Sequence, residues 1–209
     1  MSSITLITKF TNELYIPLAV NNPSSVVSQS TPNNSVSLQS TIDKVERDIL
    51  VNSLGITTYN ELQTALLDLP NADQKWKDLV NGVKYDGKVW EGLGNDFSLL
   101  AYAIYYTFLK QNTNFYMAIG MSKPNSENAV NVNPTQKLVW AWENFLVKYQ
   151  QRRCFQDFVY NYREFYYSDE FYNNEAFVSL FEFLTDKSAD YGFDSSKFKF
   201  YKMINSLGI

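Results

Sequence analysis

Residues 97–108 read Phe-Ser-Leu-Leu-Ala-Tyr-Ala-Ile-Tyr-Tyr-Thr-Phe. Their apolar positions recur at helical spacing, and Tyr102, Tyr105 and Tyr106 widen the apolar stripe until it covers nearly the whole circumference. A helix that is apolar on nearly every side is buried by its neighbours. We therefore predict that this stretch is the central helix of the fold and that the rest of the chain packs around it.

Three helices are predicted on the N-terminal side of this stretch. From Val36 an apolar residue recurs every three or four positions, and Gly55 is a natural left-handed residue at the end of a helix. A second helix follows and ends at Pro70, and a third ends at Gly82. The expected N-terminal caps are Thr58 with Glu61 for the second helix, Asn71 with Gln74 for the third, and Asn95 or Asp96 for the central helix.

A β-hairpin is predicted between the third helix and the central one. Residues 83–90 alternate apolar and polar positions on either side of Asp86-Gly87, a dipeptide that favours a type I′ turn. An isolated hairpin is only marginally stable in water. We therefore expect it to pack on the helices or on a neighbouring subunit.

Two further helices are predicted on the C-terminal side. Pro134, in a first turn, opens a long helix whose pattern can continue toward Tyr166. Ser168 is the expected cap of the next helix, which runs through Phe177 to Leu184. The remaining residues are expected to hold a short helix and a tail.

Turn-forming residues dominate residues 1–35, and residues 112–133 show no sustained helical period. Such a long stretch without regular structure is usually functional or flexible. The predicted fold class is mainly α: a helical bundle with one small β-hairpin and extended N-terminal, central-loop and C-terminal arms. The predicted division is an N-terminal arm at 1–35, a helical domain at 36–187 and a C-terminal tail at 188–209.

The composition argues against several functional classes. The chain of 209 residues has a net charge of −4, unlike the clustered positive charge that nucleic-acid binding draws on. It contains no His and a single Cys, Cys154, which we interpret as a buried inert thiol. No apolar run approaches the roughly 20 residues that span a bilayer. We expect no cofactor, no metal ion and no membrane contact, in a soluble chain made in the cytoplasm.

Paired carboxylates are the catalytic chemistry that this composition leaves open. A carboxylate-based hydrolase needs two acidic residues on either side of a cleft, one of them with a raised pKa. The candidates are Asp169, Glu170, Glu164, Asp157 and Glu143. Asp169 and Glu170 directly follow Ser168 and are better explained as acids at a helix N-terminus. We favour a protein without catalytic residues and keep the hydrolase as an alternative.

The segment 112–133 carries aromatic and methionine side chains that would be costly to leave in water. A disordered connector is one interpretation of it, and an arm that lies on another subunit is the favoured one. The predicted subunit-contact residues are Phe115, Tyr116, Met117, Ile119, Met121, Lys123, Pro124 and Glu127, with Tyr15 and Ile209 toward the two ends of the chain.

Several segments in a fixed order form a recognisable pattern. They are residues 76–82 leading into 85–93, the helical residues 99–106, and residues 122–128. Residues 15–18, the helix ending at Gly55 and the closing residues 207–209 match as well. Together they resemble head–tail connector proteins of tailed phages that infect Bacteroidetes, including the crAss-like group. The N-terminal region is longer and richer in Asn and Ser than the pattern of that family.

The resemblance implies a structural virion protein of the phage neck. Its subunits would form a homo-oligomeric ring of about twelve copies that joins the portal and capsid to the tail. The implied partners are other copies of the chain, the portal protein and adjacent neck or tail ring proteins, with genomic DNA only passing through the channel. No cofactor or reaction accompanies this resemblance. Another tail-completion or virion interaction protein is the alternative that the same bundle could serve.

Overall fold

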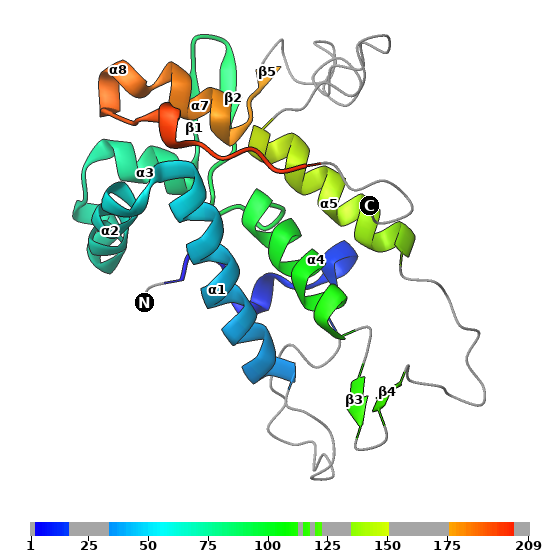
Figure 1. Ribbon diagram of the computed structural model, residues 1–209. Helices are drawn as coiled ribbons and strands as arrows, with labels where there is room; N and C mark the ends of the chain where they lie inside the picture. Colours follow the sequence, from blue (N-terminus) through cyan, green and yellow to red (C-terminus); the bar gives the residue numbers. More distant parts are fainter. Residues whose placement is uncertain are drawn as a thin grey trace, which may run out of the picture.

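The computed structural model describes residues 3–16, 34–112, 115–117, 120–122, 135–150 and 176–202 (Figure 1). These residues form a mainly helical bundle with a small sheet beside it, which confirms the predicted fold class. Helix α4 (Leu99–Asn112) packs against α1 (Asn34–Leu54) on one side and α5 (Thr135–Gln150) on the other.

Helix α4 is the buried centre of the bundle, as its sequence predicts. Leu100 and Ile104 are fully buried and Tyr105 nearly so. The cap differs from the prediction, because the helix begins after Ser98, whose Oγ accepts a hydrogen bond from the N–H of Ala101 at 3.3 Å. Asn95 instead accepts from the N–H of Phe97 and forms a turn before the helix.

The predicted end of α1 is confirmed, since Gly55 follows it with a φ of +79°. Helix α2 (Ile56–Ala65) begins directly after this glycine, so the predicted cap Thr58 lies inside the helix and the capping pair with Glu61 is wrong. A 3₁₀ helix, η3 (Leu66–Asn71), then continues through Pro70. Helix α3 is Gln74–Asn81.

The predicted cap of α3 is also wrong. Asp73 occupies the N-cap position without a side-chain hydrogen bond to the helix. The Asn71 amide instead donates to the Asp68 carboxylate at 2.9 Å. Polar residues before a helix therefore compete for local turns, which the sequence pattern does not resolve.

The hairpin is confirmed and belongs to a larger sheet. Strands β1 (Val83–Tyr85) and β2 (Lys88–Trp90) pair antiparallel, and the turn residues Asp86 and Gly87 both have positive φ, as a type I′ turn requires. Strand β5 (Ala176–Phe177) adds to β2 in parallel.

Phe177, predicted in a helix, therefore lies in a strand. Helix α7 (Leu180–Asp186) begins only after Ser179, whose Oγ accepts from the N–H of Glu182. The predicted cap Ser168 lies outside the described residues. Helix α5 begins directly after Pro134, and its predicted continuation toward Tyr166 also lies outside the described residues, as does Cys154.

The segment 112–133 contains two short strands that its sequence pattern does not predict. Strands β3 (Phe115–Met117) and β4 (Gly120–Ser122) pair antiparallel and form a second hairpin. Each strand is only three residues long, too short for an alternating pattern to stand out.

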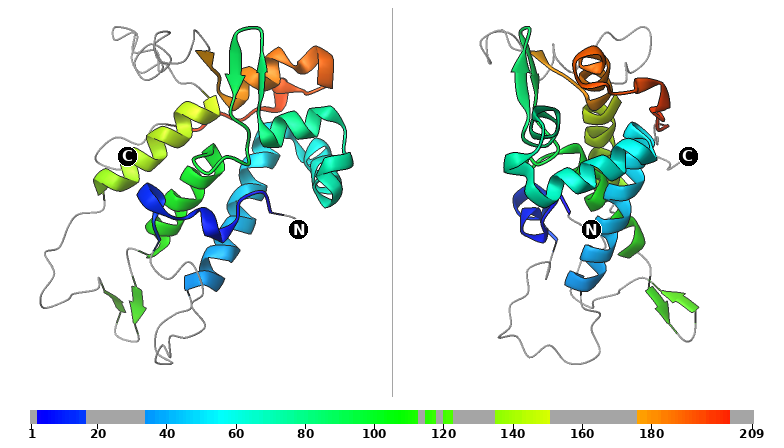
Figure 2. Two further views of the ribbon diagram at one scale, coloured as in Figure 1. Left: turned by 180° about the vertical axis from the view of Figure 1, so that it is seen from behind. Right: turned by 90° about the vertical axis from the view of Figure 1, so that its left-hand side faces the viewer.

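Both terminal segments of the described chain pack on the helices. Residues 3–16 contain η1 (Ile7–Lys9) and η2 (Asn12–Leu14) and cross α1 and α4, as the view from behind shows (Figure 2). Helix α8 (Ser188–Tyr191) and η4 (Ser195–Lys197) follow α7. The division into an arm, a domain and a tail stays a prediction.

Candidate interaction surfaces

The hairpin is fixed to the body because the chain after β2 returns to the end of α3. The carbonyl of Leu79 accepts from the Trp90 indole N–H at 3.1 Å and from the N–H of Leu93 at 3.1 Å. The carbonyl of Val80 accepts from the N–H of Gly94 at 2.7 Å. Carbonyls at a helix end lack partners within the helix, so these bonds satisfy them.

Two glycines make this return possible. A Cβ on Gly82 would lie 2.5 Å from the carbonyl oxygen of Trp90, and a Cβ on Gly92 would lie 2.5 Å from the nitrogen of Gly82. Both glycines also have positive φ. Residues 76–94 thus form one closely packed unit.

A small charged cluster joins the hairpin to α7. Lys88 Nζ lies 2.6 Å from Asp186 Oδ2 and 3.3 Å from Glu182 Oε1. The Tyr85 hydroxyl donates to the same Asp186 oxygen at 2.9 Å. The hydrogen bond to Asp186, ahead of that to Glu182, raises the pKa of Lys88, so the lysine stays charged.

Two buried carboxylates in the described chain hold other segments in place. Asp78 accepts from Gln74 Nε2 at 2.6 Å and from the Tyr191 hydroxyl, which fixes α8 on α3. The bond to Asp78 and burial raise the pKa of Tyr191 to about 12. Glu46 accepts from the backbone N–H groups of Ile4, at 3.1 Å, and Thr5.

Both of these acids are therefore bonded to donors of the chain itself. Of the predicted catalytic candidates, Glu143 is exposed on α5. The others, Asp157, Glu164, Asp169 and Glu170, lie outside the described residues.

The most distinctive feature near the C-terminus is an extended segment, residues 198–202, which we name the strap. It crosses from α7 over the end of α1 and along α5 (Figure 1). The N–H of Lys199 donates to the Asn52 carbonyl at 2.9 Å, and its carbonyl accepts from the Tyr149 hydroxyl at 3.0 Å. Burial raises the pKa of Tyr149, so its hydroxyl remains a donor.

The Gln150 side chain holds the middle of the strap through both of its polar atoms. Its Oε1 accepts from the N–H of Tyr201 and its Nε2 donates to the carbonyl of Tyr201, each at 2.8 Å. The Tyr201 ring packs edge-on against Trp142 and Tyr149. The Asn52 amide donates to the Tyr201 hydroxyl at 2.9 Å. One edge of the strap is therefore bonded to the bundle.

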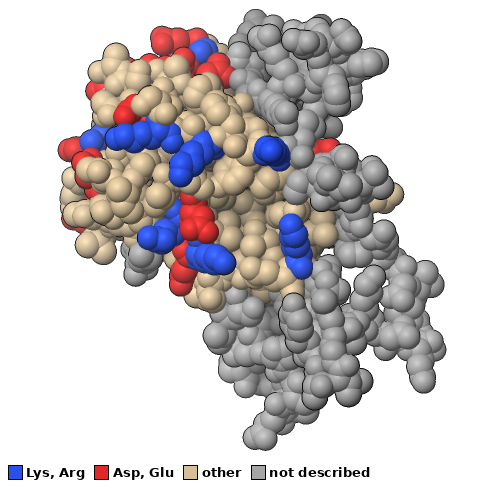
Figure 3. All heavy atoms as spheres, in the orientation of Figure 1, with Lys and Arg blue, Asp and Glu red and all other residues tan. Residues whose placement is uncertain are grey.

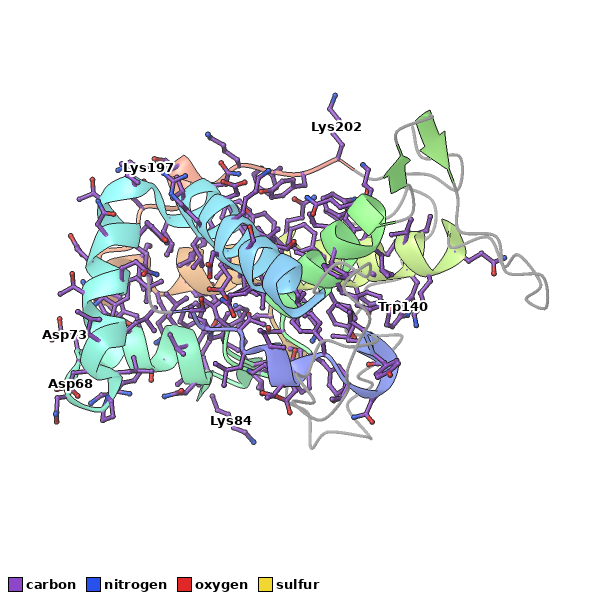
Figure 4. All side chains as sticks on the ribbon, turned by 90° about the horizontal axis from the view of Figure 1, so that it is seen from below. Asp68, Asp73, Lys84, Trp140, Lys197 and Lys202 are labelled. Carbon is purple, nitrogen blue, oxygen red and sulfur yellow. The ribbon has the colours of Figure 1, made fainter. Side chains whose placement is uncertain are left out.

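The opposite side of the strap faces outward and is both apolar and basic. The Phe200 side chain is 60% exposed. Lys199 and Lys202 are exposed beside it, and Lys197 immediately precedes the strap. In the space-filling view, basic side chains follow the course of the strap (Figure 3). Figure 4 shows Lys197 and Lys202 near its two ends, with Lys202 pointing away from the helices.

Other large apolar side chains are exposed elsewhere on the described surface. Leu67 in η3 is 78% exposed, next to Asp68, which Figure 4 labels. Ile56, Leu6 and Tyr15 are each more than half exposed. Tyr15 is one of the predicted contact residues, and its exposure leaves it accessible to a partner.

The remaining predicted contact residues divide into two groups. Phe115, Tyr116 and Met117 in β3 and Met121 in β4 lie together in the second hairpin. Ile119, Lys123, Pro124, Glu127 and Ile209 lie outside the described residues. The strap was not predicted as a contact site, although Lys-Phe-Lys-Phe at 197–200 is a two-residue alternation that could have indicated it.

No helix in the described part of the chain is long and apolar enough to cross a membrane. The same residues contain no group of three or more Asp, Glu, Cys or His placed to hold a metal ion. No protein-family model, curated protein or solved structure matches the chain.

Proposed function

We propose that this protein is a structural, non-enzymatic subunit of a ring in a phage neck, which joins the portal and capsid to the tail. The proposal starts from the resemblance to head–tail connector proteins. Within the structure it is supported by the closely packed unit at 76–94, where two of the resembling segments fold together through the Gly82–Gly92 crossing.

The observation that carries the proposal is the strap. The fold holds one edge of this segment through the Gln150 side chain, which bonds to both the N–H and the carbonyl of Tyr201, while Phe200 and two lysines are exposed to solvent. An aromatic side chain fixed in an exposed position is typical of protein interaction sites, where burial by a partner removes it from water. Exposed Leu67 and Tyr15 add apolar groups on other faces.

A ring subunit uses at least two different surfaces, because each copy contacts one neighbour with one face and the next neighbour with another. Closure of the ring then gives every copy a neighbour on both of these surfaces. In this proposal about twelve copies assemble beneath the portal. Adjacent neck or tail ring proteins cover the remaining surfaces, and genomic DNA passes through the channel.

The first experiment is a mass measurement of the purified full chain in solution, with negative-stain electron microscopy of the same sample. Closed rings of about a dozen subunits are the expected result. A strict monomer across the accessible concentration range, which also fails to bind a purified portal ring of the same phage, would refute the proposal.

A deletion tests the central segment. Removing residues 113–128 keeps α4 intact and takes away the second hairpin with its predicted contact residues. We expect the variant to stay folded and helical by circular dichroism and to lose ring assembly. As a control, Thr57→Ala changes an exposed residue of α2 that has no assigned contact role. An unchanged ring in the deletion variant would contradict the assigned role of this segment.

A further inference from the structure

The strap has one bonded edge and one free edge. Lys199 and Tyr201 each direct both their N–H and their carbonyl toward the bundle. Residues two apart that share a bonding direction are typical of an extended strand, in which the residue between them points its backbone groups the opposite way. Phe200 makes no backbone hydrogen bond within the described part of the chain. The alternation ends at Lys202, whose carbonyl accepts from the Trp142 indole.

The side chains along the free edge are held in place. The Phe200 ring lies 4.9 Å from the ring of Phe181 in an edge-on contact and 5.2 Å from that of Phe198. Lys197 is paired with Asp194 at 3.3 Å. Lys199 and Lys202 are exposed and form no ion pair within the described residues.

We propose that the free edge of the strap binds an extended, acidic segment of another protein, which adds to it as a strand. The N–H and carbonyl of Phe200 would pair with the partner's backbone, which is how strand addition supplies affinity. Carboxylates of the partner would face Lys199 and Lys202, and an apolar side chain would cover Phe200. The inference rests on the proposed function in one respect: it takes the partner to be an adjacent virion protein.

Two other occupants fit less well. A strap from a second copy would bring the exposed Lys199 and Lys202 of both copies into one strand pair, and like charges at such close range repel. A single-stranded nucleic acid could stack a base on Phe200, but it would leave the free backbone N–H and carbonyl unused. The chain also has a net charge of −4, which opposes a polyanion.

The test uses the full chain labelled with nitrogen-15 and three probes. These are capped peptides of sequence Glu-Val-Glu-Val-Glu and Lys-Val-Lys-Val-Lys, and a ten-residue oligothymidylate. A lone short strand binds weakly, so we expect the acidic peptide to shift the amide resonances of residues 198–202 with a Kd of about 1 mM. The basic peptide and the oligothymidylate should leave them unchanged. No shift with about 5 mM acidic peptide, or equal shifts with the oligothymidylate, would overturn the inference.

Two substitutions at one position separate backbone pairing from charge attraction. Phe200→Ala removes the ring and keeps the N–H. Phe200→Pro removes the aromatic ring and also the outward N–H. Because a residue before a proline favours an extended backbone, Lys199 keeps its conformation and the inward bonds of Lys199 and Tyr201 are retained. We expect affinity for the acidic peptide to fall about threefold in Phe200→Ala and at least about tenfold further in Phe200→Pro.

Equal affinity of the two variants would mean that no strand is added. The amide resonances of Lys199 and Tyr201 in each variant report whether the strap itself stays docked. This readout does not depend on ring formation. If the chain binds the acidic peptide but neither forms a ring nor binds the portal ring, the inference stands and the proposed function is refuted. If the chain forms a ring but its strap does not bind the peptide, the proposed function stands and the inference is refuted.

Discussion

Single residues decide the geometry of the unit at 76–94. Gly82→Ala and Gly92→Ala would each force a Cβ to within 2.5 Å of backbone atoms, so we expect each to lower the free energy of unfolding by about 3 kcal/mol or more. Gly87→Ala is the matched control, because Gly87 also has a positive φ but has nothing within 4 Å of an added Cβ. It should lose only about 1 to 2 kcal/mol. Urea unfolding measures all three, and equal losses would refute the close backbone crossing.

Glu46 makes stability depend on pH. Burial raises the pKa of its carboxyl above the ordinary 4.5, against the hydrogen bonds from Thr5 and Ile4. The folded protein therefore holds this proton more tightly than the unfolded chain does. Its contribution to stability is complete below pH 4.5 and is lost as the pH rises through the raised pKa.

Glu46→Gln removes this titration while other carboxyl groups remain. We expect the unfolding free energy of the wild type minus that of the variant to fall as the pH rises from 4.5 toward neutrality. Urea unfolding in steps of pH measures the difference, with Glu61→Gln on the exposed side of α2 as the control. A difference that grows with pH would show that the sign assigned to Glu46 is wrong.

At the scale of elements, the Gln150 side chain of α5 holds the middle of the strap on the bundle. Gln150→Glu keeps the acceptor for the Tyr201 N–H, loses the donor to the Tyr201 carbonyl and buries a carboxylate there. We expect a loss of about 2 kcal/mol and faster hydrogen exchange at the Tyr201 amide, with α4 unaffected. Asn52→Ala, which removes only the bond to the Tyr201 hydroxyl, should cost about 1 kcal/mol. Unchanged exchange at Tyr201 in Gln150→Glu would contradict this account.

Elements with a long apolar period were predictable from the sequence, and short ones were not. Helix α1 was placed by repeats of one apolar face, α4 by apolar residues around nearly its whole circumference, and the hairpin by its Asp-Gly turn. The region before α7 was misassigned because Phe177 fits the helical face that Leu180 and Leu184 continue. Phe177 is in a strand because it pairs with β2, which is remote in sequence and so does not show in the local pattern. The strap was missed for a related reason, since its docking depends on Gln150, about fifty positions away.

At the scale of the whole molecule, residues 3–16 belong to the core as much as the helices do. Phe10, Leu14 and Ile16 are almost completely buried. Burying each such side chain contributes about 1.5 to 3 kcal/mol, and a domain has only about 5 to 15 kcal/mol in total. We expect a chain that lacks residues 1–16 to lose cooperative thermal unfolding, measured by circular dichroism. Leu6→Ser, at an exposed position, should melt as the wild type does. A cooperative transition near the wild-type temperature in the truncated chain would contradict this role.

Both ends of the described chain are fastened to the same helix. The N-terminal segment is bonded at Glu46 and the strap at Asn52, six residues apart on α1, a rise of about 9 Å along the axis. Local unfolding of this stretch, which is fewer than two turns of one helix, would therefore loosen a contact of each end at once.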